Sequence, residues 1–101
     1  RDCMFSTEVA IWASDTHQIL DKENKKILNN TCGVVIGNHV WCGTRCTILK
    51  GTRVSDNSII GAASVVSGQF EQPNIIIAGN PARKIKENID WARDSLPGVI
   101  A

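Results

Sequence analysis

A six-residue repeat runs through the middle of the chain and constrains its fold more than any other feature. From Ile36 onward the sequence divides into IGNHVW, CGTRCT, ILKGTR, VSDNSI, IGAASV and VSGQFE. The first position is apolar in every unit and holds Ile36, Cys42, Ile48, Val54, Ile60 and Val66. The fifth position holds Val40, Cys46, Thr52, Ser58, Ser64 and Phe70, and the second is small everywhere except at Leu49. A fixed short period of this kind is the signature of a repeat architecture.

The six-residue period has a direct structural meaning. A short extended segment followed by a tight corner turns the chain through about a third of a circle, so three units close one three-sided coil. Successive coils stack at about 4.8 Å, the spacing of hydrogen-bonded strands. The first position then points inward, and small residues at the second position let the backbone turn and approach its neighbours closely. The repeat therefore predicts an all-β fold, a parallel β-helix.

The same register extends upstream as CMFSTE and VAIWAS, with Cys3 and Val9 inward and small residues at Thr7 and Ala13. It then fails, and a polar, lysine-rich stretch at about 15–33 reads as a loop extruded from the coil. Loops of this length inside a compact domain are uncommon and are often functional.

After the repeats comes an apolar run at 75–77 and then Ala78-Gly79-Asn80-Pro81. Ile85, Ile89 and Ala92 recur at helical spacing beyond the proline, which predicts a short C-terminal helix covering the last coil. We therefore expect one β-helix domain over 1–101, with a loop at about 15–33, hexads at 36–71 and a cap or helix at 79–96. Because the chain opens with Arg1 and its first coil has no cap, we expect further N-terminal sequence.

Composition excludes several classes of function. The formal net charge is +1, so no strong field favours nucleic acid as a partner. No apolar run approaches the roughly 18 residues of a membrane span and no signal peptide is visible, although a chain that opens with Arg1 need not show one. We expect a cytoplasmic location. The four cysteines form no CxxC pair, and we expect buried reduced thiols in place of disulfides or a zinc site.

Several segments together carry a family likeness. VVIGNHVWCGTRCTILKGTRVSDNSIIGAASVVS and NIIIAGNPARKIK resemble the hexapeptide-repeat acyltransferases, which fold as left-handed parallel β-helices. Upstream, SDTHQILD resembles the segment that carries the catalytic histidine in the capsular-polysaccharide group. The likeness covers roughly residues 3–91 and is greatest to the sugar O-acetyltransferases. The sequence departs from the usual family pattern at Cys42, Ser55 and Ala63, and at SGQF.

The resemblance implies a function for the loop. Acetyl transfer to a hydroxyl needs a base that takes the proton and a donor for the developing oxyanion. His17 stands where the family has its catalytic base, and Asp15 either orients the ring, contacts the substrate or caps the loop. His39 occupies an outward position, where we expect an exposed side chain without a role. Two histidines are fewer than the three protein ligands of a catalytic zinc, so we expect no metal.

The resemblance also implies a binding site along the coil. Trp41, at a sixth position, either packs against a neighbouring subunit or loop, or walls the active-site cleft as a substrate contact. The family's coenzyme A contacts fall on Thr44, Ala62, Ser67, Arg83 and Lys86. We add Lys84 as a phosphate ligand, the alternative for this charged run being a solvated helix face.

The leading hypothesis is an O-acetyltransferase that moves an acetyl group directly from acetyl-CoA to a sugar hydroxyl. By resemblance it is a homotrimer with active sites between subunits and a glycan or small-molecule acceptor. Two alternatives stay open: a non-catalytic β-helix trimerisation module, and a metal-dependent hydratase similar to the hexapeptide-repeat carbonic anhydrases.

Overall fold

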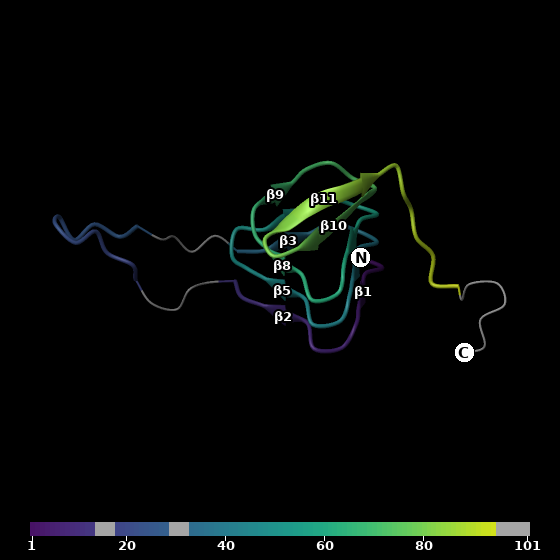
Figure 1. Ribbon diagram of the computed structural model, residues 1–101, viewed down its shortest axis with the longest axis horizontal. Helices are drawn as coiled ribbons and strands as arrows, with labels where there is room; N and C mark the ends of the chain where they lie inside the picture. The colour runs from purple at the N-terminus through teal and green to yellow at the C-terminus, as the bar shows by residue number, and fades with distance from the viewer. Residues whose placement is uncertain (14–17, 29–32, 95–101) are drawn as a thin grey trace.

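The computed structural model describes residues 1–13, 18–28 and 33–94, which wind as a coil through three sheets (Figure 1). Face 1 contains β1 (Met4–Phe5), β4 (Trp41–Cys42), β7 (Ile59–Ile60), β10 (Ile75–Gly79) and β11 (Ala82–Glu87). Face 2 contains β2 (Ala10–Ile11), β5 (Thr47–Ile48) and β8 (Val65–Val66). Face 3 contains β3 (Val35–Ile36), β6 (Arg53–Val54) and β9 (Gln69–Phe70). Every pairing except that of β10 with β11 is parallel, so the predicted parallel β-helix is confirmed.

The register follows the hexads. Trp41 pairs with Ile59 and Thr47 with Val65, each 18 residues further along the chain. First and fifth positions together form the core, whose fully buried members include Val40, Cys42, Cys46, Ile48, Thr52, Ser58, Ile60 and Val66. The last unit is shorter than predicted, because Phe70 pairs with Val54 and so takes a first position instead of a fifth.

The fourth position makes the corners. His39, Arg45, Asn57 and Ala63 all have φ between 56° and 62°, and Gly51 at the equivalent place has φ 76°. This left-handed conformation turns the chain sharply, and it is uncommon in residues other than glycine. Gly51, Asn57 and His39 are residue types that favour this conformation locally, whereas at Arg45 and Ala63 the corner is set by the stacking of coils.

The first coil joins the array in a different phase from the one predicted. Phe5 and Ile11 take the first position, because they pair with Cys42 and Ile48. Cys3 and Val9 fall instead at the fifth position, where both still pack against the core. The small positions predicted at Thr7 and Ala13 are wrong for the same reason. Phe5 and Ile11 are 47% and 48% exposed, since no described coil lies beneath them.

An insertion separates β2 from β3. Strand partners on faces 1 and 2 are 37 residues apart across it, against 18 between the next two coils, so it adds 19 residues. Its described part, 18–28, is a small hairpin that projects away from the coil (Figure 1), with Leu20 bridged to Ile27. The Asp21 carboxylate accepts the N–H groups of Asn24 and Glu23, which lowers the pKa of that carboxyl.

The predicted C-terminal helix is wrong: residues 82–87 form a strand, and the described part of the chain contains no helix. The chain turns at Gly79, with φ 106°, and at a cis Asn80–Pro81 bond, and β11 returns antiparallel to β10. Helical spacing misled because Ile85 lies at the register shift of this hairpin and is 63% exposed, while Ala82 is buried. Pairing with the open edge of β10 satisfies more backbone groups than an isolated short helix would.

The described cysteines are free thiols packed as small hydrophobes. Cys42 and Cys46 are buried, and Cys3 is partly buried. Burial raises the pKa of the Cys42 thiol to about 12. Cys32 lies outside the described residues. Within the described part, no helix has the length and apolar character needed to cross a membrane.

Candidate active site

The two residues that the resemblance assigns to the insertion, His17 and Asp15, lie outside the described residues. The chain reaches them from β2, on face 2 of the coil. Their assignment therefore stays a prediction, and the geometry below concerns the surfaces along which a substrate and a cofactor would lie.

Trp41 lies on face 1, in β4, between the strands that hold Met4 and Ile59. It is only half-exposed, because Trp91 packs against it at a ring-centroid distance of 5.9 Å and an angle of 48°. Its indole Nε1 is buried and has no acceptor among the described residues. Contact with a neighbouring subunit or loop was one reading of this tryptophan, yet the contact found here comes from the C-terminal segment of the same chain.

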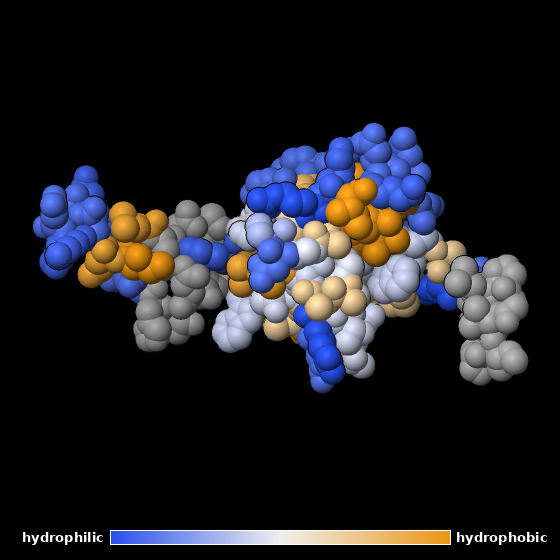
Figure 2. Space-filling model, in the orientation of Figure 1, coloured by the Kyte–Doolittle hydropathy of each residue, from blue (hydrophilic) through white to orange (hydrophobic). Residues whose placement is uncertain are grey.

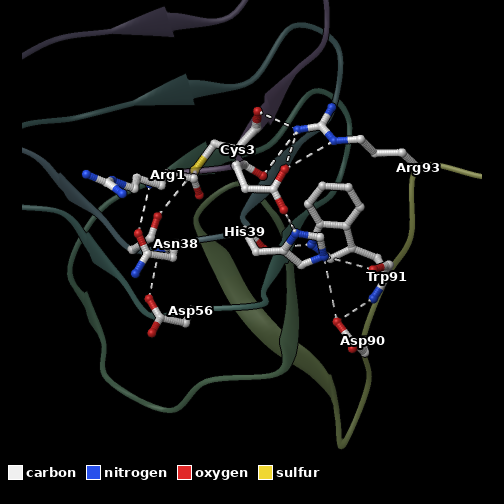
Figure 3. Close-up of polar contacts among 10 residues, drawn as sticks. Arg1, Cys3, Asn38, His39, Asp56, Asp90, Trp91 and Arg93 are labelled. Atoms are coloured by element: carbon white, nitrogen blue, oxygen red, sulfur yellow. Dashed lines mark hydrogen bonds and ion pairs between the residues drawn. The ribbon is translucent and has the colours of Figure 1, made fainter.

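His39 is not the exposed side chain that its outward position suggested. Its imidazole stacks on the indole of Trp91, with centroids 3.8 Å apart and planes 8° apart, and its side chain is 24% exposed (Figure 3). Nε2 lies 2.9 Å from the carbonyl oxygen of Trp91, and Nδ1 lies 2.6 Å from Asp2 Oδ2. The Trp91 carbonyl, and then the Asp2 carboxylate, raise the pKa of His39. No sequence pattern signalled this cluster, since its members are 37 and 52 residues from His39.

Thr44 and Ala62 occupy the corner between faces 1 and 2 in successive coils. The carbonyl of Thr44 accepts a hydrogen bond from the N–H of Ala63 at 2.8 Å, which holds the two coils together there. Gly43 lies directly against Ala62: a Cβ on Gly43 would stand 2.7 Å from the Ala62 nitrogen. Ala62 is exposed and Thr44 partly so, which leaves a smooth edge with small side chains. Such an edge suits a thin, flexible chain such as a pantetheine arm.

Ser67 does not lie at this corner. It follows β8, so β8 separates it from Ala62, and its side chain is exposed at the corner between faces 2 and 3. The structure thus brings Thr44 and Ala62 together and places Ser67 at the far end of the same side of the coil.

Arg83 and Lys86 lie on β11, the outermost strand of face 1, and both are exposed. Neither makes an ion pair within the described part of the chain, and Arg83 donates only to the neighbouring carbonyl of Ala82. Lys84 is already paired, with its Nζ 3.0 Å from Glu87 Oε2 and 3.1 Å from Gln72 Oε1. Hydrogen bonds from Gln72 and Lys84 lower the pKa of Glu87. The reading of this run as a helix face is wrong, and of its three cations Lys84 is the least suited to a new phosphate.

Metal ligands do not gather in the described ranges. Among residues 1–13, 18–28 and 33–94, no three His, Cys, Asp or Glu side chains lie together as they would around an ion.

Comparison with known proteins gives the following relatives. No protein-family model matches the chain. The chain is 42% identical over 102 aligned residues to a polysialic acid O-acetyltransferase of Escherichia coli O1:K1 / APEC, covering 100% of this chain and 33% of that protein. The crystal structure of the polysialic acid O-acetyltransferase OatWY superposes with a TM-score of 0.91 at 40% identity, over 98% of this chain and 47% of that one.

A galactoside acetyltransferase in complex with coenzyme A superposes with a TM-score of 0.60 at 32% identity, over 84% of this chain and 44% of that one. The chain thus spans about a third of the curated relative and under half of the two solved chains.

Proposed function

This chain belongs to the hexapeptide-repeat acetyltransferase family, and we propose that the protein transfers an acetyl group from acetyl-CoA to a sugar hydroxyl. One observation carries the proposal: the alignment to a sugar O-acetyltransferase, at 42% overall identity, spans the whole chain and so includes the insertion and the β10–β11 hairpin as well as the coil. A chain that shared only the repeat scaffold would align over the hexads alone. We further propose that the coil is left-handed and that the enzyme works in the cytoplasm.

The proposed acceptor is a hydroxyl of a bacterial capsular glycan or its precursor. The Escherichia coli relative, which aligns with the whole of this chain, is a polysialic acid O-acetyltransferase. An anionic sialic acid polymer is therefore the first acceptor to test. A small sugar such as the galactoside of the third relative is the natural comparison.

In the proposed reaction, bound acetyl-CoA supplies an activated acyl thioester. His17 takes the proton from the acceptor hydroxyl as that oxygen attacks the acyl carbon, the carbon–sulfur bond breaks, and coenzyme A leaves as a thiolate that takes up the proton from His17. Asp15 orients the imidazole or contacts the acceptor. The thiols of Cys42 and Cys46 are buried, and a pKa of about 12 for Cys42 makes it a poor nucleophile. Direct transfer, without an acyl-enzyme, is therefore the mechanism these residues favour.

The cofactor site proposed for coenzyme A runs along the coil edge toward β11. Thr44 and Ala62 offer small side chains and backbone groups at one corner, and Ser67 a hydroxyl at the next. Arg83 and Lys86 supply the cations for the phosphates, because charge-assisted bonds to phosphate are the stronger ones. The close approach of Gly43 to Ala62 keeps this edge thin enough for such a chain.

Replacing Arg83 or Lys86 by alanine should raise the dissociation constant of coenzyme A by about threefold to tenfold, as expected for exposed charge pairs. Isothermal titration calorimetry measures the constant, and the loss should shrink at high salt. Lys84→Ala is the matched control, since Lys84 is held by Glu87 and Gln72. Equal losses in all three variants would contradict the assignment.

The active sites are proposed to lie between the subunits of a homotrimer. The resemblance to the hexapeptide-repeat acyltransferases supports this proposal, because the active-site clefts of that family lie between subunits. The hairpin of the insertion also carries an exposed apolar patch (Figure 2), with Leu20 46%, Ile27 56% and Leu28 63% exposed. Contiguous apolar surface of this kind marks an interaction site.

Replacing Leu20 and Leu28 together by serine should weaken the trimer, because this removes apolar area that a neighbour would bury. Light scattering coupled to gel filtration should then find a smaller species at low micromolar concentration, with activity reduced in parallel. Lys22→Ser, an exposed change in the same hairpin, should leave the mass unchanged. A monomeric wild type would contradict the proposed site between subunits.

The function itself is tested on the full-length protein. Incubation with acetyl-CoA and a panel of sugars, polysialic acid among them, should release free thiol only in the presence of one acceptor, with an equal amount of acetyl ester formed. Binding of coenzyme A without transfer to any acceptor, or no binding at all, would overturn the proposal.

A further inference from the structure

The segment that follows β11 runs along one edge of the coil and contacts three of the four turns that lead into face 1. We call residues 89–93 the strap. Ile89 donates its N–H to the carbonyl of Asn74 at 3.1 Å, and Asn74 Nδ2 returns a bond to the Ile89 carbonyl at 2.9 Å. Trp91 Nε1 donates to the carbonyl of His39 at 2.7 Å, and Arg93 donates to Asp2 Oδ1 at 3.2 Å and to the Cys3 carbonyl at 3.0 Å. The strap is thus hydrogen-bonded to the turns that precede β10, β4 and β1.

His39 is the central contact of the strap. Asp2 Oδ2 faces its Nδ1 at 2.6 Å, and the Trp91 carbonyl faces its Nε2 at 2.9 Å. A carboxylate and a carbonyl can only accept, so both ring nitrogens must donate for both bonds to form. A neutral imidazole has one N–H and satisfies one of them, whereas an imidazolium satisfies both. The geometry selects the protonated ring.

The charges around His39 act in the same direction. Asp2 and Asp90 face the ring, Asp90 Oδ1 at 3.9 Å from Nε2. Two cations lie in this region: Arg93 pairs with Asp2 and stands 5.6 Å over the Trp91 ring, and Arg1, whose carbonyl accepts the His39 N–H, donates its ammonium to Asn38. The Trp91 carbonyl and the Asp2 carboxylate accordingly raise the pKa of His39.

The strap ends against the proposed active-site wall. Trp91 is 8% exposed, with His39 stacked on it and the tilted indole of Trp41 in contact. Trp41 itself has no hydrogen bond through Nε1 among the described residues, so packing against Trp91 is the contact that orients it from this side. Any motion of the strap therefore reaches Trp41 directly.

We infer that His39 is a positioning residue that, when protonated, clamps the strap and through Trp91 fixes the indole of Trp41 in the active site. The inference rests on the proposed function and on the role that the family resemblance implies for Trp41, a wall of the active-site cleft. Since the folded pKa of His39 lies above its unfolded value near 6.5, its contribution is fully present below about pH 6.5 and is lost as pH rises through the folded pKa. The clamp opens on the alkaline side.

Tryptophan emission of the full-length protein tests the clamp without any assay of activity. A protonated imidazole stacked on an indole quenches its fluorescence, so emission should rise with pH through a single titration whose midpoint lies above 6.5. His39→Gln and Trp91→Phe should each abolish this titration. Asp2→Asn, a change at an exposed side chain, should move the midpoint to lower pH because it removes the facing charge.

Steady-state kinetics test the link to Trp41. Below the titration, His39→Gln should raise the KM for the acceptor by about fivefold relative to wild type, the lower end of typical couplings between sites. At pH values above the titration of His39, the acceptor KM of the variant and that of the wild type should become equal, because both enzymes then lack the charged ring. The KM for acetyl-CoA should not follow this pattern.

The outcomes separate the two proposals. Emission that does not titrate, or that titrates unchanged in His39→Gln, overturns the clamp. Emission that titrates as expected, with equal acceptor KM values at all pH, overturns the positioning of Trp41. If emission titrates and no acceptor is acetylated, the proposed function has failed and the positioning of an active-site wall falls with it. Asp2→Asn keeps the proposal testable if His39→Gln fails to fold, because it leaves His39 in place and should still shift the midpoint of the titration.

Discussion

Replacing His17 by alanine should reduce kcat for acetyl transfer by at least about 100-fold, the usual lower bound of a general base contribution. The proposed role is removal of the acceptor proton, and alanine cannot perform it. The dissociation constant of coenzyme A should stay within about twofold, since a base makes its contribution only as the hydroxyl reacts. Thiol release under saturating acetyl-CoA gives the rate, and calorimetry gives the binding.

Gln18→Ala is the matched control for the base, because Gln18 is an exposed neighbour in the same insertion and has no proposed chemistry. Its rate should equal that of wild type. In the wild type, kcat should also rise with pH as the base loses its proton, and the residual rate of His17→Ala should lack this rise. Near-normal turnover in His17→Ala would exclude the mechanism.

The two histidines then act at opposite ends of the pH range. Deprotonation turns His17 into a base, whereas deprotonation of His39 releases the strap. If both inferences hold, the acceptor kcat/KM of the wild type is bell-shaped, with its acid limb from His17 and its alkaline limb from His39. Each limb should vanish in the matching single variant, which makes the two contributions separable.

The hexad register was predicted correctly from Ile36 to Val66, where the repeat is unbroken. In the first coil it was placed two residues too early, because two registers fit the sequence there. The fifth position of one hexad and the first of the next both point inward and lie two residues apart, on either side of the sixth position. Cys3 and Phe5, like Val9 and Ile11, form such pairs, so either register buries apolar side chains. Size favours one of them: the larger residue takes the first position in most pairs, as in Ser58 before Ile60, although Val40 before Cys42 is an exception, and Phe5 and Ile11 follow the majority.

The remaining features depend on contacts that no local pattern encodes. The hairpin of β10 and β11 forms because the last coil offers an open strand edge, and helical spacing of three apolar residues could not reveal that edge. The stack of His39 on Trp91 joins residues 52 positions apart. The family likeness reached His17, Trp41 and the cofactor residues, whereas the strap came only from three-dimensional packing.

Replacing Gly43 by alanine should both destabilise the coil and weaken coenzyme A binding. A Cβ at Gly43 would lie 2.7 Å from the Ala62 nitrogen and 2.9 Å from its Cα, so backbone and not a flexible side chain must move. Overpacking of this kind costs about 1–3 kcal/mol. For a domain of this size, each 1 kcal/mol lowers Tm by about 4–8 °C, which calorimetric unfolding resolves easily.

Gly33→Ala provides the control, because a Cβ at Gly33 meets nothing within 4 Å and should leave Tm nearly unchanged or slightly raised. The pair separates loss of glycine as such from loss of the close approach between coils. In Gly43→Ala the shift of Ala62 should also raise the dissociation constant of coenzyme A, measured well below the new Tm. A variant that loses stability yet binds as wild type would remove Ala62 from the cofactor site. The small second position of the hexad would then serve the stacking of coils alone.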